Sequence, residues 1–350
     1  MSGEEVNSIT INLMTPPIII FILLTILSYI FVYLIRRWVV KDYLLDHPND
    51  RSMHSMPIPR GGGLAIVLVV LGAGLFSAGQ TDLNHSLVYV ACGIIIALLG
   101  WRDDVKSLSP IIRFAVQGIV AVVSIISMGY FKSVTIPLFG ELQLGVVGVV
   151  ITFLWIIGLT NAYNFMDGID GMAGGVAVSA GLGWMWLSSA SGNSFAFWVA
   201  LAISAGSLGF LFHNWSPAKI FMGDVASTFL GYSFAVLSLL SADEGGDALL
   251  LGTLLMWTFI MDAGLTFINR LRKGEKVFSA HRSHLFQRLV IGGYKHSTVS
   301  SLYILLTLFA GYLSYEWARG HQFAAPIIFL GLPLIWILLS RYTSRLRNVD

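Results

Sequence analysis

Residues 16–37 read PPIIIFILLTILSYIFVYLIRR, and this stretch decides the fold class. It carries no charge before its final two arginines, and about 20 apolar residues in a helix cross the roughly 30 Å of hydrocarbon in a bilayer. Glu4 and Glu5 precede it without any Lys or Arg, and it is too long for the apolar part of a cleavable signal peptide. We therefore expect a retained transmembrane helix, with the N-terminus outside.

The rest of the chain repeats this pattern. Of its 350 residues, 56% are hydrophobic and 11% are charged, whereas about 25% are charged in an ordinary soluble domain. The composition predicts an all-α, polytopic integral membrane protein, a single domain over residues 1–350 with about eleven transmembrane helices. The apolar blocks lie near residues 16–36, 61–78, 87–100, 110–129, 145–160, 171–189, 195–213, 225–241, 248–269, 297–316 and 324–340.

The basic residues lie almost entirely on one side of these helices. If the N-terminus is outside, the connections after the odd-numbered helices and the C-terminal tail hold all of the 21 Lys and Arg residues except Lys132 and Arg319. Cytoplasmic loops carry such an excess of positive charge. The sequence therefore predicts a periplasmic N-terminus, a cytoplasmic C-terminus and a place in the inner (cytoplasmic) membrane. One outer connection, FKSVTIPLFGELQLG over residues 131–145, alternates apolar and polar residues and predicts a short β-hairpin.

Five polar segments fall on the cytoplasmic side of this topology. Because the topology rests on the basic residues and the apolar blocks, the shared side of the segments indicates one site that faces the cytoplasm, where costly polar groups line a cavity. The segments are RSMHSMPIPRGGG (51–63), GWRDDVKSLSPIIR (100–113), NAYNFMDGIDG (161–171), FMGDVAS (221–227) and HRSHLFQR (281–288).

The carboxylates in these segments predict a metal site. Asp103 and Asp104 are adjacent, Asp167 and Asp170 are three residues apart, and Asp224 follows a glycine. Converging acids repel one another unless a cation or a proton compensates them. Mg²⁺ prefers oxygen ligands and takes only one or two protein carboxylates, so we expect Mg²⁺, with Mn²⁺ as the alternative. The competing interpretation is that these acids cap helices.

The segment from residue 161 to residue 171 has a regular spacing. Asn161, Asn164, Asp167 and Asp170 recur every three residues, which places neighbours on one helix face. They can present carbonyl and carboxylate oxygens to a metal and a nucleotide. The competing interpretation is an amide ladder between helices that pack through small residues.

Basic and aromatic side chains complete the candidate site. Guanidinium groups bind phosphate oxygens bidentately and imidazoles can donate hydrogen bonds to phosphates or sugars, so the pattern indicates a polyanionic substrate. Phe221 either stacks on a nucleobase or only packs. Asp262, inside a predicted helix, is either a buried polar link or part of the site. The basic candidates are His54, Arg60, Arg113, His281, Arg282, His284 and Arg288, and glycines 61–63 allow close helix packing.

Together these motifs resemble the polyprenyl-phosphate N-acetylhexosamine-1-phosphate transferases of glycosyltransferase family 4. The twin aspartate, NxxNxxDGxDG, FMGD and HRxH occur in the family's order over residues 51–288. The chain is most similar to the WecA-like branch that begins O-antigen, common-antigen and other cell-surface glycans. HRSHLFQR lacks the consecutive histidines of the MurNAc-pentapeptide translocase branch, and PIPRGGG stands where that branch has TPTMGG.

The resemblance implies that undecaprenyl phosphate attacks the β-phosphorus of a UDP-N-acetylhexosamine, releasing UMP at the cytoplasmic face. It implies that Asp103 or Asp104 is catalytic, that Asp224 with Asn164 binds Mg²⁺, and that Phe221 stacks on uracil. The remaining candidates would contact the substrates, namely Asn161, Asp167, Asp170, Arg113, His281, Arg282, His284, His54 and Arg60. A homodimer is compatible with the short loops, and no nucleic acid is expected as a partner.

Two other classes of protein compete with this interpretation. The CDP-alcohol phosphotransferases need a motif that ends in DGxxAR, whereas DGIDGMAGG has no arginine. A secondary transporter would place carboxylates near the middle of the membrane in broken helices, whereas these acids lie at helix ends on one side. The donor sugar stays open among UDP-GlcNAc, UDP-GalNAc, UDP-FucNAc and UDP-QuiNAc, which differ by groups that one loop residue could distinguish.

Overall fold

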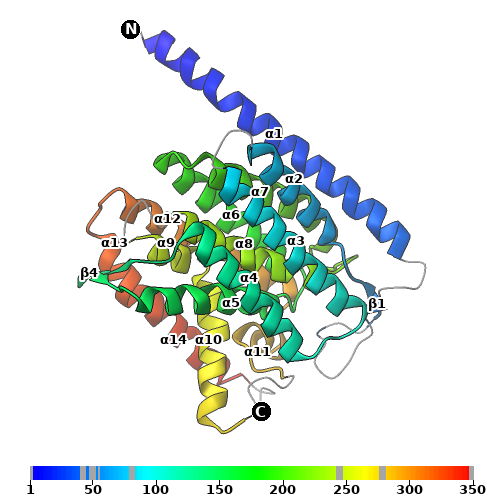
Figure 1. Ribbon diagram of the computed structural model, residues 1–350. Helices are drawn as coiled ribbons and strands as arrows, with labels where there is room; N and C mark the ends of the chain where they lie inside the picture. The colour runs from blue at the N-terminus through cyan, green and yellow to red at the C-terminus, as the bar shows by residue number, and fades with distance from the viewer. Residues whose placement is uncertain are drawn as a thin grey trace.

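The computed structural model describes residues 3–39, 45–46, 53, 56–78, 83–241, 247–275 and 281–346, and side chains in the first helix from residue 17. It is a bundle of helices with two small hairpins (Figure 1). The all-α membrane fold is confirmed, because helices cover every predicted apolar block. The first helices along the chain are α1 (Gly3–Val39), α2 (Leu64–Ala78), α3 (Leu83–Val105), α4 (Pro110–Met128), α5 (Val147–Met166), α6 (Met172–Ser191) and α7 (Ser194–Asn214).

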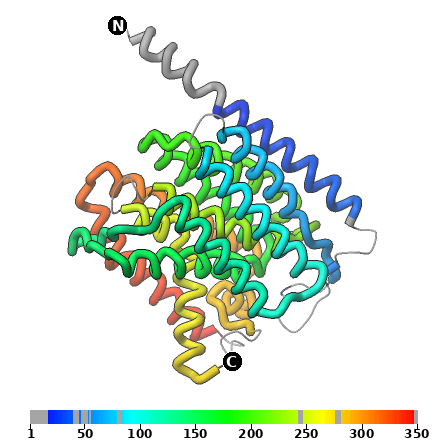
Figure 2. The backbone as a smooth tube through the Cα atoms, in the orientation of Figure 1, coloured from blue at the N-terminus to red at the C-terminus, as the bar shows by residue number. Residues whose placement is uncertain are grey.

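The later helices follow in the same bundle (Figure 2). They are α8 (Asp224–Leu240), α9 (Ala248–Leu255), α10 (Trp257–Arg272), α11 (Leu285–Ile291), α12 (His296–Ala318), α13 (Ala324–Pro326), a π-helical turn η2 (Ile327–Gly331) and α14 (Leu332–Thr343). Within the described residues, seven helices are long and apolar enough to cross a membrane, or eight if α9 and α10 form one broken span. The protein is thus multi-pass, and the total of eleven crossings and the sides of the two termini stay predictions.

The block at residues 248–269 differs from the single helix that was predicted. It breaks into α9 and α10, which meet at Met256 with a bend of 83°. No local residue signals the break, and the two halves have different main neighbours, since α9 packs on α8 and α12 while α10 packs on α5 as well as α12. The sequence between the two helices contains no proline.

The predicted hairpin is confirmed. Strands β3 (Ser133–Ile136) and β4 (Gly140–Gln143) pair antiparallel, and Gly140, at a φ of 91°, begins β4 directly after the turn. A second, two-residue pair joins β1 (Leu45–Asp46) to β2 (Ile58–Pro59). In Figure 1, β4 and β1 lie at opposite sides of the bundle, so the two hairpins mark opposite ends of the helices.

Helix α8 runs through the centre of the bundle, and all but its first and last residues are buried (Figure 1). Close backbone approach makes this possible. A Cβ on Gly100 of α3 would lie 2.2 Å from the Asp224 carbonyl oxygen, and one on Gly231 would lie 2.6 Å from the Leu159 carbonyl oxygen. A Cβ on Gly63 would lie 2.3 Å from the Cβ of Ala226, so the expected close packing at glycines 61–63 is confirmed.

Candidate active site

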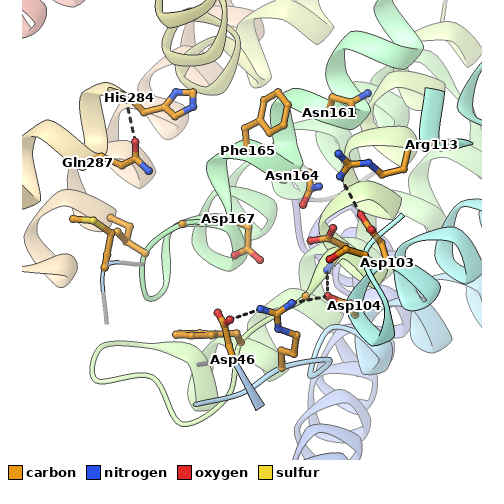
Figure 3. A pocket seen from close by; sticks show the side chains of 18 of the residues that line it. Asp46, Asp103, Asp104, Arg113, Asn161, Asn164, Phe165, Asp167, His284 and Gln287 are labelled. Atoms are coloured by element: carbon orange, nitrogen blue, oxygen red, sulfur yellow. Dashed lines mark hydrogen bonds and ion pairs between the residues drawn. The ribbon is translucent and has the colours of Figure 1, made fainter. Parts of the chain in front are cut away.

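A polar cavity of about 490 Å³ lies where the ends of α3, α5 and α8 meet the neighbouring loops (Figure 3). His54 lies outside the described residues, and Arg282 is exposed and does not line the cavity. Arg288 and Asp262 do not line the cavity either. The fold brings together the remaining predicted site residues. These are Arg60, Asp103, Asp104, Arg113, Asn161, Asn164, Asp167, Asp170, Phe221, Asp224, His281 and His284.

The Asp104 carboxylate caps the N-terminus of α8. Its Oδ1 accepts the N–H of Asp224 and its Oδ2 accepts the N–H of Val225, each at 3.0 Å. The first N–H groups of a helix lack partners within the helix, so a carboxylate there satisfies two of them and complements the helix dipole. Gly223, at φ 79°, leaves room for this contact. Asp104 therefore joins α3 to α8 and holds Asp224 at the cavity.

Arg60 connects this junction to the first loop. Its guanidinium pairs closely with Asp46 and lies 3.8 Å from Asp104 Oδ1. The neighbouring backbone is tied in as well, because the Phe221 N–H donates to the Pro59 carbonyl at 2.7 Å. Asp46 was missed by the sequence analysis, since a lone aspartate in a loop gives no signal until its arginine is placed beside it.

Asp103 forms an ion pair across the turn from α3 to α4. Its Oδ2 lies 3.0 Å from an Arg113 amino group, and its Oδ1 accepts the Leu108 N–H at 2.6 Å. The Arg113 side chain remains about one-third exposed. Since a guanidinium carries five N–H donors in a planar fork, Arg113 can bind a phosphate oxygen while it stays paired with Asp103.

The donor set around Asp224 fits a hard divalent cation. The Asp224 carboxyl lies within hydrogen-bonding range of Asp103 and near the charge of Asp104. Three adjoining anions of this kind repel unless a cation or proton compensates them. In the described part of the chain, no three His, Cys, Asp or Glu side chains form a complete metal cage. Mg²⁺ does not need one, because one or two carboxylates suffice when waters and substrate phosphates fill the other positions.

The two asparagines on α5 have different surroundings. Asn164 Oδ1 accepts the Ser227 hydroxyl at 2.7 Å, which sets it one turn along α8 from Asp224. A carbonyl oxygen has two lone pairs, so this bond leaves it able to bind a cation. Asn161 Nδ2 donates to Gln117 Oε1 of α4 at 2.7 Å. The interhelical amide contact that competed as an interpretation is therefore present at Asn161.

Asp167 directly follows α5 and lines the cavity. Burial, and then the negative charge of Asp104, raise the pKa of Asp167 to about 7. Near neutral pH, protonation of Asp167 removes one negative charge from the acidic cluster and so weakens the attraction for a cation. We therefore expect cation binding at the cavity to strengthen as the pH rises through 7.

Asp170 is held by its neighbours on several sides. Its Oδ2 accepts the Ala218 N–H at 3.1 Å, its Oδ1 lies 3.4 Å from His296 Nδ1, and its carbonyl accepts the Ser300 hydroxyl at 2.7 Å. Burial alone would raise the pKa of Asp170, but the contacts with His296 and Ala218 outweigh it and lower the pKa. His296 also lines the cavity and was missed, because a single histidine at the start of a helix forms no motif.

His284 and Gln287 form another part of the wall, on the far side from Asp103 and Arg113 in Figure 3, and His281 also lines the cavity. The ring centroids of His281 and His284 are 4.8 Å apart, and the backbone N–H of His284 donates to Gln287 Oε1 at 3.2 Å. His284 directly precedes α11, a short helix that was not predicted. Gln287 was not among the predicted site residues, and it reaches the cavity because α11 forms here.

The His281→Gln variant should change how the stability of the ligand-free protein depends on pH. Burial, followed by the nearby His284 and Arg270, lowers the pKa of His281 to about 4. Between pH 6.5 and 4 the unfolded chain therefore binds a proton that the folded chain does not, and the wild type loses stability as the pH falls. Between pH 7 and pH 4.5, the free energy of unfolding should therefore fall by about 1 kcal/mol less in His281→Gln than in the wild type, since solvent partly screens the half-buried ring. Thermal unfolding in detergent at pH 7 and pH 4.5 measures it, and equal losses in both proteins would contradict it.

The fold and the cavity define an integral membrane protein with a polar site, lined by carboxylates and arginines from different elements. The chain belongs to glycosyltransferase family 4, since the model of Glycosyl transferase family 4 matches residues 86–242 and full-length relatives agree. The predicted resemblance is thus confirmed, and the chain is a member of a transferase family.

Three relatives illustrate the similarity. A probable undecaprenyl-phosphate N-acetylglucosaminyl 1-phosphate transferase of Bacillus subtilis is 33% identical over 91% of this chain and 87% of its own length. The undecaprenyl-phosphate α-N-acetylglucosaminyl 1-phosphate transferase of Yersinia pestis is 31% identical over 90% of this chain and 88% of its own length. Its counterpart in Escherichia coli strain K12 is 30% identical over 81% of this chain and 78% of its own length.

Proposed function

We propose that this protein transfers an N-acetylhexosamine-1-phosphate from a UDP-sugar to undecaprenyl phosphate, forming the first lipid-linked intermediate of a cell-surface glycan. The observation that carries the proposal is the cavity in which Asp103, Asp104 and Asp224 meet beside Arg113. Such a site suits two phosphate substrates that must be brought together despite their charge. The names of the relatives support a GlcNAc donor and an undecaprenyl-phosphate acceptor.

The reaction exchanges one phosphate linkage for another. An oxygen of the lipid phosphate forms a bond to the β-phosphorus of the UDP-sugar, and the bond from that phosphorus to the α-phosphate oxygen breaks, so UMP leaves. Asp224 and Asn164 are the residues that would hold Mg²⁺, or Mn²⁺ in its place. When bound, the cation neutralises the charge of the diphosphate and orients it.

The side chains of the protein position the two phosphates. Arg113 can hold a phosphate oxygen through the guanidinium nitrogens that do not contact Asp103. Of the two aspartates proposed as catalytic, Asp103 is the better placed to face the lipid phosphate. The Asp103 side chain is 8% exposed and pairs with the partly exposed Arg113, whereas the Asp104 side chain is 1% exposed and both of its oxygens accept backbone N–H groups of α8. Asp104 therefore acts by holding α8, and with it Asp224.

We also propose that the cavity opens to the cytoplasm and that the protein resides in the inner membrane. The distribution of Lys and Arg supports this orientation, since the cavity lies at the ends of the helices where the basic residues gather. A UDP-sugar is made in the cytoplasm, so this orientation gives the site access to its donor. A homodimer stays part of the proposal without affecting the chemistry.

A product assay tests the proposed function. Purified protein with Mg²⁺, undecaprenyl phosphate and each of UDP-GlcNAc, UDP-GalNAc, UDP-FucNAc and UDP-QuiNAc should release UMP with at least one donor, and we expect UDP-GlcNAc to be used. Release of UDP instead would show transfer of the sugar alone. A transporter with a carboxylate cation site, the alternative function, would release neither nucleotide and would move ions across proteoliposome membranes.

Phe221→Ala should weaken donor binding more than it slows turnover. Phe221 lines the cavity, and stacking of an aromatic ring on a base contributes about 1 to 3 kcal/mol. We therefore expect KM for the UDP-sugar to rise about 5- to 150-fold while kcat changes little. Phe165, a second cavity aromatic that is 48% exposed, provides the matched variant Phe165→Ala. An unchanged KM in Phe221→Ala, with a raised one in Phe165→Ala, would transfer the stacking role to Phe165.

A further inference from the structure

Asp262 is buried behind the wall that carries His284. It lies on α10, is 1% exposed, and does not line the cavity. An unpaired carboxylate in such a place would be costly, so its partners indicate what it does. All of them belong to α10 itself, to the segment around α11 or to α12.

The carboxylate of Asp262 holds the first turn of α11. Its Oδ1 accepts the Leu285 N–H at 2.8 Å, and its Oδ2 accepts the Phe286 N–H at 3.2 Å. The Tyr303 hydroxyl of α12 donates to Oδ2 at 2.5 Å, and the Thr266 hydroxyl donates to Oδ1 at 3.3 Å. Helix α11 is short, and helices of this length are not stable alone, so these contacts fix where it starts.

The same carboxylate adjoins the imidazole of His284. The Nδ1 atom lies 3.3 Å from Asp262 Oδ1, close enough for an electrostatic contact although not aligned as a hydrogen bond. The ring stacks on Phe286, with centroids 5.7 Å apart and an interplanar angle of 15°. Asp262 thus restrains His284 in two ways, through the backbone of the next two residues and through the contact with the His284 ring.

Phe286 extends this restraint to the acidic side of the cavity. A Cβ on Gly168 would lie 2.7 Å from the Phe286 ring, so the ring packs closely against the turn between Asp167 and Asp170. One buried carboxylate on α10 therefore sets the relative positions of His284 and of this turn.

We propose that Asp262 is a positioning residue that orients His284 toward the donor diphosphate and keeps α11 against the turn at Gly168. This inference rests on the proposed function, since it assigns His284 to the same substrate. A buried carboxylate beside an imidazole restrains the orientation of the ring, and loss of such an outer partner typically lowers activity about 10- to 100-fold.

A double-mutant cycle between Asp262 and His284 tests the inference. Asp262→Asn and His284→Ala should each lower kcat/KM for UMP release about 10- to 100-fold. If Asp262 acts through His284, kcat/KM of the double variant should be no more than about threefold lower than that of the less active single variant, because the two losses are not independent. Losses that multiply, or an Asp262→Asn variant with wild-type kcat/KM, would overturn the inference.

Two further variants separate positioning from general stability. Thr258→Val removes the 3.2 Å contact between Thr258 and Thr307, which also joins α10 to α12 but does not touch Asp262. It should retain wild-type kcat/KM. If Asp262→Asn does not fold, Leu285→Pro removes one donor to Asp262 at the first position of α11. Proline is tolerated there, and His284 already has the extended conformation (φ −62°, ψ 150°) that precedes proline. Its loss of activity should be equally non-additive with His284→Ala, and multiplying losses would overturn the inference here too.

Calorimetric binding of UDP gives the same cycle without turnover. We expect the effects of Asp262→Asn and His284→Ala on the Kd for UDP to be non-additive as well. A wild-type protein that binds UDP but releases no UMP would contradict the proposed function while the cycle on binding still decides the role of Asp262. A wild-type protein that does neither would contradict both.

Discussion

Asp224→Asn should lower kcat for UMP release about 10³-fold while the protein stays folded. Asp224 begins α8 at the cavity, where its carboxyl adjoins Asp103 and Asp104. A carboxylate-bound divalent cation contributes several kcal/mol of charge stabilisation to phosphoryl transfer, and each 1.36 kcal/mol is a factor of ten in rate. The amide keeps the shape of the side chain but loses the negative charge that attracts the cation.

The matched control is Asp247→Asn, the same chemical change next to α9 and away from the cavity lining. It should retain wild-type turnover and wild-type dependence on Mg²⁺ concentration. Near-normal UMP release from Asp224→Asn with an unchanged Mg²⁺ requirement would remove Asp224 from the metal site. A tenfold or larger rise in the Mg²⁺ concentration needed for half-maximal activity would support the assignment.

Gly100→Ala should lower both stability and activity through a change that adds only one methyl group. The added Cβ would lie 2.2 Å from the Asp224 carbonyl oxygen and 2.8 Å from the Val225 Cα, so α3 and α8 must move apart. Overpacking of this kind costs about 1 to 3 kcal/mol, and a 1 Å displacement in an active site can cost about 100-fold in rate. Asp103 and Asp104 follow Gly100 by three and four residues on α3, so the shift reaches both of these cavity carboxylates directly.

Gly72→Ala is the control for this prediction, since a Cβ at Gly72 of α2 meets no atom within 4 Å. Alanine favours a helix over glycine by about 1 kcal/mol, so this variant should be as stable as the wild type or more stable. If thermal unfolding and turnover of Gly100→Ala match those of Gly72→Ala, the close contact between α3 and α8 does not hold the site together.

The sequence predicts the helices and the members of the site well, because both depend on local signals. Apolar blocks of membrane-spanning length identify the helices, and the alternation in residues 131–145 identifies the β3–β4 hairpin. Polar groups at the helix ends identify the cavity residues, because such groups are costly in a membrane unless they face a polar cavity or a partner. The shared side of Asp103, Asp167 and Asp224 follows from the topology alone.

Contacts between distant segments could not be predicted. Nothing local shows that Asp104 caps α8 rather than facing a ligand, since its partners lie about 120 residues later along the chain. Asp46 and His296 are isolated residues that become part of the cavity only beside Arg60 and Asp170. For Asp262 the sequence left two interpretations open, and the structure shows the buried polar link.

Labelling of single cysteines from each side of the membrane, with and without donor, tests the central claim. The claim is that helices far apart in the sequence build one cytoplasmic donor site. Single cysteines replace Ser107 and Phe165, which line the cavity from different elements, and Leu142 of β4, in a Cys92→Ala background. A membrane-impermeant maleimide is applied to vesicles of each orientation, with and without UDP-GlcNAc and Mg²⁺. We predict that the Ser107→Cys and Phe165→Cys variants react only from the cytoplasmic side and are protected by the donor, while the Leu142→Cys variant reacts only from the other side. Labelling of 107 and 165 from opposite sides, or no protection of either, would contradict the account.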